Sequence, residues 1–182
     1  MKYIIRAAVP DDQPFLWEML YYAAHMDEGR EPPESARTNA ALAPYLEGFG
    51  RPDDCGVIAL DAATGTPCGA AWIRRMPSTW PLYRFVEAAT PELAIAVAPA
   101  HLGRGAGGLM LARLLADAAA NHHAIVLSVR ANNPAKALYE RLGFTVVAEI
   151  TNRVGGASFI MKVALTPRAE APRFSRPRSA RL

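Results

Sequence analysis

Apolar and polar residues alternate along this chain with two different periods, which divide it into short strands and helices. A two-residue period or a short apolar run predicts strands at 3–7, 57–61, 68–75, 93–98, 125–129, 146–150 and 158–165. Helical spacing predicts helices at 15–26, 35–46 and 109–120, and a last helix between Asn133 and Gly143. Strands and helices in this order indicate one α/β domain of the mixed α+β type.

The most informative stretch is residues 92–113. Its strand has small residues on one side and large residues on the other, Ala94 and Ala96 against Leu93, Ile95 and Val97. Four glycines follow at positions 103, 105, 107 and 108, and an apolar helix comes next. Glycine permits positive φ and close approach of a ligand, and the first turn of a helix has free N–H groups. The stretch therefore predicts an anion site suited to phosphate, with tight packing of the turn as the alternative explanation.

Two nucleotide-binding motifs do not fit this turn. A Walker loop needs a Lys after its last Gly, and none follows here. A dinucleotide-binding fingerprint can be placed on Gly103, Gly105 and Gly108, but no acid ends a second strand about 20 residues later.

The turn does resemble the acetyl-CoA pyrophosphate loop of the GNAT superfamily of N-acetyltransferases, R/Q-x-x-G-x-G/A after a strand ending in V-x-P. Here the strand ends in Val97-Ala98-Pro99, and the loop runs from Leu102 to Gly107. Leu102 departs from the pattern, because the family has Arg or Gln at this position, and Arg104 supplies a nearby cation. Residues 132–144, NNPAKALYERLGF, also resemble the family signature N-x-x-A-x-x-L-Y-E-x-x-G-F at every fixed position.

This resemblance covers Glu92 to Phe144 and implies a fold, a cosubstrate and a set of contacts. The GNAT-type fold is a mixed central sheet, flanked by helices and splayed open between its fourth and fifth strands. Acetyl-CoA is the implied acyl donor, without a metal, and a bulge in the 93–98 strand would direct a backbone N–H at the thioester carbonyl. The implied cofactor-binding residues are Ile95, Ala96, Val97, Leu102, Gly103, Arg104, Gly105, Ala106, Gly107, Gly108, Asn132 and Tyr139.

Two residues are candidates for catalysis. Glu92 is the candidate general base that takes a proton from the acceptor ammonium, because it opens the central strand on the side of the small alanines. Tyr139 stands where the family has the general acid that protonates the departing thiolate. His101, beyond the other end of the strand, is an alternative base. Each also has a structural interpretation: Glu92 as a solvent-facing strand end, and Tyr139 as a packing residue against Phe144.

The family resemblance implies that the first two helices and their connection form part of the acceptor site. Here that connection is acidic, which would attract a cationic amine. Its charged residues are Asp27, Glu28, Glu31 and Glu34, with Arg30 as the cation between them. Aromatic residues that could line a pocket are Trp17, Tyr21, Tyr22, Trp80 and Tyr83.

Charge and composition divide the chain into a domain at 1–165 and an Arg/Pro-rich tail at 166–182. The tail carries five arginines against one acid, so the net charge of +3 leaves the domain at about −1. A tail of this composition is expected to be a solvated extension, and it could alternatively contact RNA, a membrane surface or an acidic partner. No apolar run is long enough to span a membrane, and the N-terminus does not resemble a signal peptide. Cys55 and Cys68 could be neighbours but are expected to be reduced thiols in a cytoplasmic protein.

The sequence therefore predicts an enzyme that moves an acetyl group from acetyl-CoA to a primary amine by direct attack. A small cationic amine is the expected acceptor. A peptide N-terminus as acceptor, or a non-catalytic acyl-CoA-binding regulator, are the alternatives. Nucleic-acid binding is not expected of the domain, and a homodimer is implied by the family alone.

Overall fold

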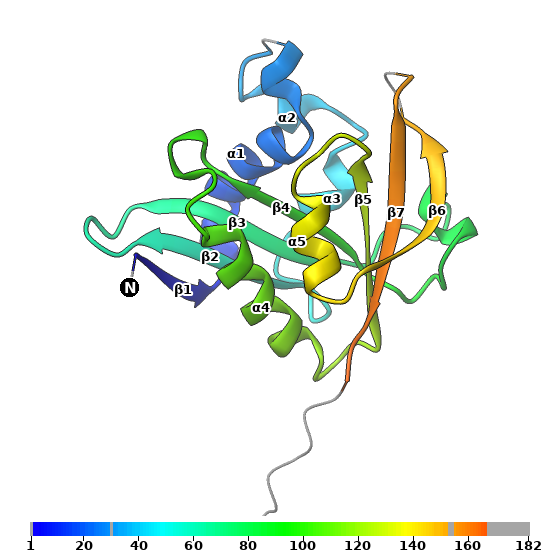
Figure 1. Ribbon diagram of the computed structural model, residues 1–182. Helices are drawn as coiled ribbons and strands as arrows, with labels where there is room; N and C mark the ends of the chain where they lie inside the picture. Colours follow the sequence, from blue (N-terminus) through cyan, green and yellow to red (C-terminus); the bar gives the residue numbers. More distant parts are fainter. Residues whose placement is uncertain (1, 30, 153–154, 167–182) are drawn as a thin grey trace, which may run out of the picture.

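The fold is built on one mixed sheet in the computed structural model, which describes residues 2–29, 31–152 and 155–166. In this part of the chain, seven strands lie in the order β1-β2-β3-β4-β5-β7-β6 (Figure 1). All neighbouring strands are antiparallel except β4 and β5. The strands are β1 Tyr3–Ala7, β2 Cys55–Asp61, β3 Pro67–Arg74, β4 Glu92–Val97, β5 Ala124–Arg130, β6 Thr145–Thr151 and β7 Ala157–Ala164. The predicted α/β fold with a mixed sheet is confirmed.

Helices cover both faces of the sheet (Figure 1). The longest, α4 (Ala106–Ala118), packs on one face together with α5 (Lys136–Arg141), and α1 (Gln13–Ala23) packs on the other. Strand β4 separates the two cores as its pattern predicts: Leu93, Ile95 and Val97 join the core under α4, whereas Ala94 and Ala96 join the core under α1. The small side chains of β4 therefore bring the α1 layer close to the centre of the sheet.

The sheet is splayed between its fourth and fifth strands, as the family resemblance implies. Strands β4 and β5 are parallel, and they pair only at Glu92 and Val126 among the described residues. Val126 also donates a backbone hydrogen bond to the Pro91 carbonyl, at 3.0 Å. Beyond this point the strands diverge, which leaves the β5 side of residues 93–97 without a strand partner in the described chain.

The helix predicted at 35–46 is wrong in its extent, because it is two short helices, α2 (Ser35–Thr38) and α3 (Ala43–Leu46). Asn39 has extended backbone, and its side-chain oxygen accepts the N–H of Ala41, at 3.0 Å, so the helix ends there. Pro44 then lies in the first turn of α3, where a missing N–H costs nothing. After the break, the Tyr45 side chain reaches the sheet, where its hydroxyl donates a hydrogen bond to Glu92 of β4.

Other departures are smaller. The first helix ends at Ala23 instead of residue 26, because His25 adopts a left-handed φ of 57° before a 3-10 turn at Met26–Gly29. The last helix begins at Lys136, although the side chain of Asn133 still accepts the N–H of Ala135, at 2.9 Å. The expected bulge in β4 is wrong for the fully described pair β3 and β4, whose register runs without a shift.

The two cysteines are free, as expected, but they are not neighbours. Cys55 begins β2 opposite Ile73, whereas Cys68 lies near the start of β3 and its thiol contacts the Ala59 carbonyl at 3.4 Å. They therefore lie at opposite ends of one antiparallel pair. Nowhere in the described residues is a helix both long and apolar enough to cross a membrane. The predicted tail at 166–182 falls, from residue 167 onward, outside the described residues.

Candidate active site

The glycine turn forms an open cradle of backbone N–H groups at the start of α4. Gly103 and Gly105 have φ of 70° and 93°, conformations that L side chains rarely adopt, and Gly105 is the N-cap of the helix. The backbone N–H groups of residues 103–108 donate no hydrogen bond to any described residue. A Cβ built at either glycine meets no atom within 4 Å. The turn therefore presents several unused donors to open space at a helix N-terminus, which suits a pyrophosphate.

Two side chains of this loop point outward. Leu102 is 62% exposed, so it replaces the family's Arg or Gln without filling the cradle. Arg104 lines a hollow of about 440 Å³ beside the loop, which it shares with Lys2 and Asp61. The cradle thus relies on backbone donors and the helix dipole, and Arg104 adds a cation at its edge.

The walls beside the turn come from β4 and α5. Gly107 lies next to Leu138 of α5 and Val97 of β4, with an ideal Cβ 3.7 Å and 3.9 Å from their methyl groups. The cradle, the open edge of β4 and α5 are therefore contiguous. Ile95 and Val97 face this α4 side, whereas Ala96 faces the α1 side. An extended ligand arm could pair with the open edge of β4 as an added strand does.

Glu92 lies where β4 and β5 begin to diverge, and it is buried with only 4% of its surface exposed. Both carboxylate oxygens accept hydrogen bonds: Oε1 from the Tyr45 hydroxyl, at 2.7 Å, and Oε2 from the Trp80 indole, at 2.5 Å. Burial raises the pKa of Glu92 to about 7, against the opposing effect of these two bonds. The interpretation of Glu92 as a solvent-facing strand end is wrong, because the side chain is enclosed.

Tyr139 lies on the other face of the sheet, in the core under α4, with its ring edge to face with Phe144, at an interplanar angle of 61° and with the centroids 5.8 Å apart. Burial raises its pKa to about 12. Its hydroxyl makes no hydrogen bond with any described residue, yet no fully buried side-chain oxygen in this part of the chain lacks a partner. The hydroxyl therefore keeps some access to solvent and holds its proton at neutral pH. Asn132, also predicted as a cofactor contact, is exposed in the turn after β5.

His101 is not brought to Glu92. Its ring contacts Tyr3, with Nδ1 3.3 Å from the tyrosine hydroxyl, and lies 4.0 Å from Asp61. This cluster is at the opposite end of β4, about 20 Å from Glu92 along the strand. The structure thus separates the alternative base from the candidate site.

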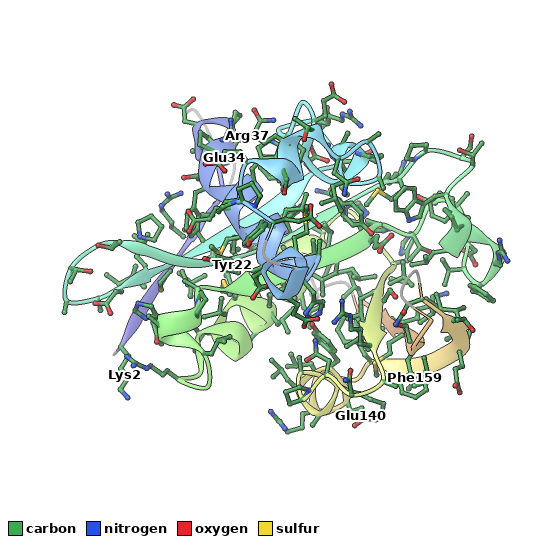
Figure 2. The ribbon with its side chains drawn as sticks, turned by 90° about the horizontal axis from the view of Figure 1, so that it is seen from above. Lys2, Tyr22, Glu34, Arg37, Glu140 and Phe159 are labelled. Atoms are coloured by element: carbon green, nitrogen blue, oxygen red, sulfur yellow. The ribbon has the colours of Figure 1, made fainter. Side chains whose placement is uncertain are left out.

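The acidic connection after α1 lies on the side of the sheet opposite α5, as Figure 2 shows for Glu34 and Glu140. Glu28 of this segment is paired, with Arg130 at the end of β5, at 2.6 Å, and with His25, at 3.1 Å. Asp27, Glu31 and Glu34 form no ion pair with any described residue, while Arg30 lies outside the described residues. Burial first, and then these three acids with the Tyr22 hydroxyl, raise the pKa of Tyr21.

The aromatic candidates fall into two groups. Trp80 contacts Glu92 directly, whereas Tyr21 donates to the Glu31 carbonyl, at 2.6 Å, and Tyr83 hydrogen-bonds the backbone of Met76. Sequence reasoning missed Tyr45 altogether, since it belongs to no motif and meets Glu92 across 47 positions of the chain. Among the described residues, no three His, Cys, Asp or Glu side chains gather in a group that could hold a metal ion.

The splayed mixed sheet and the open glycine turn at the start of α4 are the arrangement that the family resemblance implies. Residues 16–144 match the Acetyltransferase (GNAT) family. The chain belongs to the GNAT family of acetyltransferases and is an acetyl-CoA-dependent N-acetyltransferase.

Solved structures agree with this fold. The protein yncA from Salmonella typhimurium, solved with its cofactor acetyl-CoA, is 24% identical, with a TM-score of 0.63 over 96% of this chain and 100% of that one. A phosphinothricin acetyltransferase from Sinorhizobium meliloti, in complex with acetyl-CoA, is 22% identical, with a TM-score of 0.64 over 95% and 97%. Mutant forms of the spermidine/spermine N-acetyltransferase SpeG from Vibrio cholerae are 21% identical, with a TM-score of 0.61 over 90% and 95%. No curated protein gives a significant match.

Proposed function

We propose that this enzyme transfers the acetyl group of acetyl-CoA to a small cationic primary amine by direct attack, with Glu92 as general base and Tyr139 as general acid. The observation that carries the proposal is the buried carboxyl of Glu92 at the apex of the splay, with a pKa of about 7. A base with such a pKa is ionised for about half of the time at neutral pH, and it holds an abstracted proton well.

The residues divide the work of binding and proton transfer. The N–H groups at 103–108 hold the pyrophosphate, and the open edge of β4 holds the arm that leads to the thioester, which supplies the acetyl group. Glu92 accepts a proton from the ammonium of the acceptor, directly or through water, so that the neutral nitrogen can attack. As the C–N bond forms and the C–S bond breaks, the Tyr139 hydroxyl gives its proton or a hydrogen bond to the departing sulfur. The nitrogen loses a second proton as it becomes the amide, and that proton, passed through water, balances the one that the sulfur gains.

The raised pKa of Tyr139, about 12, keeps its hydroxyl protonated throughout the neutral range, so that it can donate a hydrogen bond to the sulfur as negative charge develops there. Tyr139 packs on the α4 face of the sheet, whereas the Glu92 side chain extends from β4 to the other face, where it meets Tyr45. This arrangement separates the acid from the base, so that the proton taken from the amine and the proton given to sulfur follow different routes.

A cationic acceptor is favoured by charge. Asp27, Glu31 and Glu34 give the connection after α1 a negative potential, and among the described residues of this segment Glu28 alone has partners for its carboxylate, Arg130 and the His25 ring. The spermidine/spermine acetyltransferase with the same fold acts on such amines, which supports the choice of class. A peptide N-terminus is the second candidate, favoured by the same acidic segment.

The test is release of free thiol from acetyl-CoA with a panel of acceptors: diamines and polyamines, aminoglycosides and short peptides. We expect the highest kcat/KM with a small di- or polyamine, and a KM for it that rises with ionic strength, because salt screens the acidic segment. If a short peptide instead gave the highest kcat/KM, the proposed class of small amines would be wrong and the acceptor would be a peptide N-terminus. Binding of CoA without release of thiol from acetyl-CoA in the presence of any acceptor would instead favour the non-catalytic regulator.

A further inference from the structure

The carboxylate of Glu92 accepts hydrogen bonds from two aromatic side chains that belong to two separate segments. The Tyr45 hydroxyl of α3 bonds one oxygen, and the Trp80 indole N–H, from the connection between β3 and β4, bonds the other. The two rings also contact each other edge to face, with centroids 5.5 Å apart. We propose that Tyr45 and Trp80 are positioning residues that fix the Glu92 carboxylate for proton uptake from the acceptor amine. This inference rests on the proposed role of Glu92.

Tyr45 is itself held firmly against the sheet. The Trp72 indole N–H donates to the Tyr45 carbonyl, at 3.0 Å. Arg74 of β3, which is 1% exposed, donates to the carbonyls of Glu47 and Gly48, at 2.8 Å and 2.9 Å. The backbone of α3 is therefore held within its single turn and just after its C-terminal end. A hydroxyl carried on so constrained a helix can hold a carboxylate in one orientation.

Trp80 is anchored as well. Its backbone N–H donates to the Pro77 carbonyl, at 2.8 Å, and its carbonyl accepts from Tyr83, at 3.1 Å. Leu82 and Val86 of the same connection pack against Val126, the β5 residue that pairs with Glu92. The connection that brings the indole to Glu92 is thus attached at the point where β4 and β5 meet.

The surroundings of Glu92 leave these two donors as its direct polar partners in the described chain. Arg74 is opposite Glu92 in the β3–β4 register, but its guanidinium is committed to Asp54 and to carbonyls of α3 and its flank. Tyr83 bonds the backbone of Met76, and β5 presents the apolar Val126. The buried part of α1 is apolar or aromatic. No cation of the described residues therefore offsets the buried charge, and the two hydrogen bonds are the main interactions that favour the ionised form.

Each carboxylate oxygen has two lone pairs, and the two donors use one on each. The remaining lone pairs can accept the proton from the ammonium or from a bridging water. Removing one donor should destabilise the ionised carboxylate by the free energy of one hydrogen bond to a charged group. This loss corresponds to an upward shift of about one pH unit in the titration midpoint of Glu92. The base would then be protonated over more of the neutral range.

The experiment measures the pH dependence of kcat/KM for Tyr45→Phe and Trp80→Phe, which keep the rings and remove the donors. Wild type should show an acid limb with a midpoint near 7. Each variant should move that midpoint up by about one pH unit, so that kcat/KM falls about tenfold near pH 6 and stays within about twofold above pH 9. Tyr83→Phe is the matched control, because it removes a nearby hydroxyl that does not bond Glu92, and its midpoint should equal that of wild type.

Carbon-13 NMR titration of the Glu92 carboxyl, assigned by its loss in Glu92→Gln, gives the same midpoints without turnover. Shifts in both variants support the inference. An unchanged midpoint in both, or a rate loss equal at every pH, overturns it. Failure of the proposed function can be told apart from failure of this inference. If the proposed function is wrong, wild type releases no thiol, and the NMR midpoints still decide the role of the two donors.

Discussion

Replacing Gly105 by Glu tests the glycine cradle most sharply, because its effect on stability and its effect on CoA binding can be measured separately. An ideal Cβ at Gly105 meets no atom within 4 Å, so the folded protein has room for the side chain. The cost to stability is that of a left-handed φ of 93°, about 1–2 kcal/mol. Gly65 in the β2–β3 hairpin has φ of 72° and equally open surroundings, so Gly65→Glu has the same cost without the cradle.

The effect on CoA binding comes from charge. A carboxylate about 5 Å from a bound phosphate, at an effective dielectric constant of about 20, adds about 3 kcal/mol of repulsion. Gly105→Glu should therefore raise the Kd for CoA by more than about 100-fold, and Gly65→Glu by less than about threefold. Isothermal calorimetry gives both Kd values, and thermal unfolding checks that both variants lose similar stability. If Gly105→Glu bound CoA as tightly as Gly65→Glu, the pyrophosphate would not lie at this turn.

Three further predictions follow from other parts of the structure. Tyr139→Phe should lower kcat by about 100-fold, as expected for loss of a general acid, while the calorimetric Kd for CoA stays nearly unchanged; full activity would remove Tyr139 from the mechanism. Glu92→Gln should lower kcat/KM and abolish the acid limb near pH 7, because the limb reports the carboxyl; an unaltered limb would assign it to another group. Arg74→Ala should lower the free energy of unfolding by about 3–5 kcal/mol in urea, because it leaves Asp54, whose side chain is 2% exposed, without its partner; a loss below 1 kcal/mol would contradict that account.

The direction of the pH effect at Asp54 supports the last prediction. Burial alone would raise the pKa of Asp54, but hydrogen bonds from Arg74 and from the backbone N–H groups of Arg51 and Gly50 hold it below its usual range. A carboxyl with a lowered pKa contributes stability above its unfolded pKa of about 4, and the contribution is lost as the pH falls through the lower, folded pKa. The pair therefore stays intact across the neutral range in which Glu92 titrates.

Much of the central unit could be predicted from sequence because its signals are local. The two-sided pattern of β4, the glycines of the turn and the strand–turn–helix order all lie within residues 92–113, and the structure confirms them. The splay between β4 and β5 was expected from the family resemblance alone, because no local pattern shows where two parallel strands diverge. The bulge expected on the same basis is absent from the described β3–β4 pair.

The surroundings of Glu92 could not be predicted, because they are assembled from distant segments. Tyr45 lies in a stretch whose apolar spacing predicts one long helix, and only the break at Asn39 turns it toward the sheet. Trp80 was expected among pocket aromatics, but its indole contact with a carboxylate depends on how the 75–91 connection packs on Val126. The positions of the Tyr45 and Trp80 side chains are decided by tertiary packing, which the spacing of apolar residues along the sequence does not show.

The central claim, direct transfer of acetyl from acetyl-CoA to an amine, is tested most directly with carbon-13 acetyl-CoA and a small polyamine. Mass spectrometry of the products and of the intact enzyme follows the label, alongside the thiol released. We predict one labelled amide per thiol and no labelled enzyme at any time before the acceptor is exhausted. Label that accumulates on the protein, or thiol released without a labelled amine, would contradict direct attack.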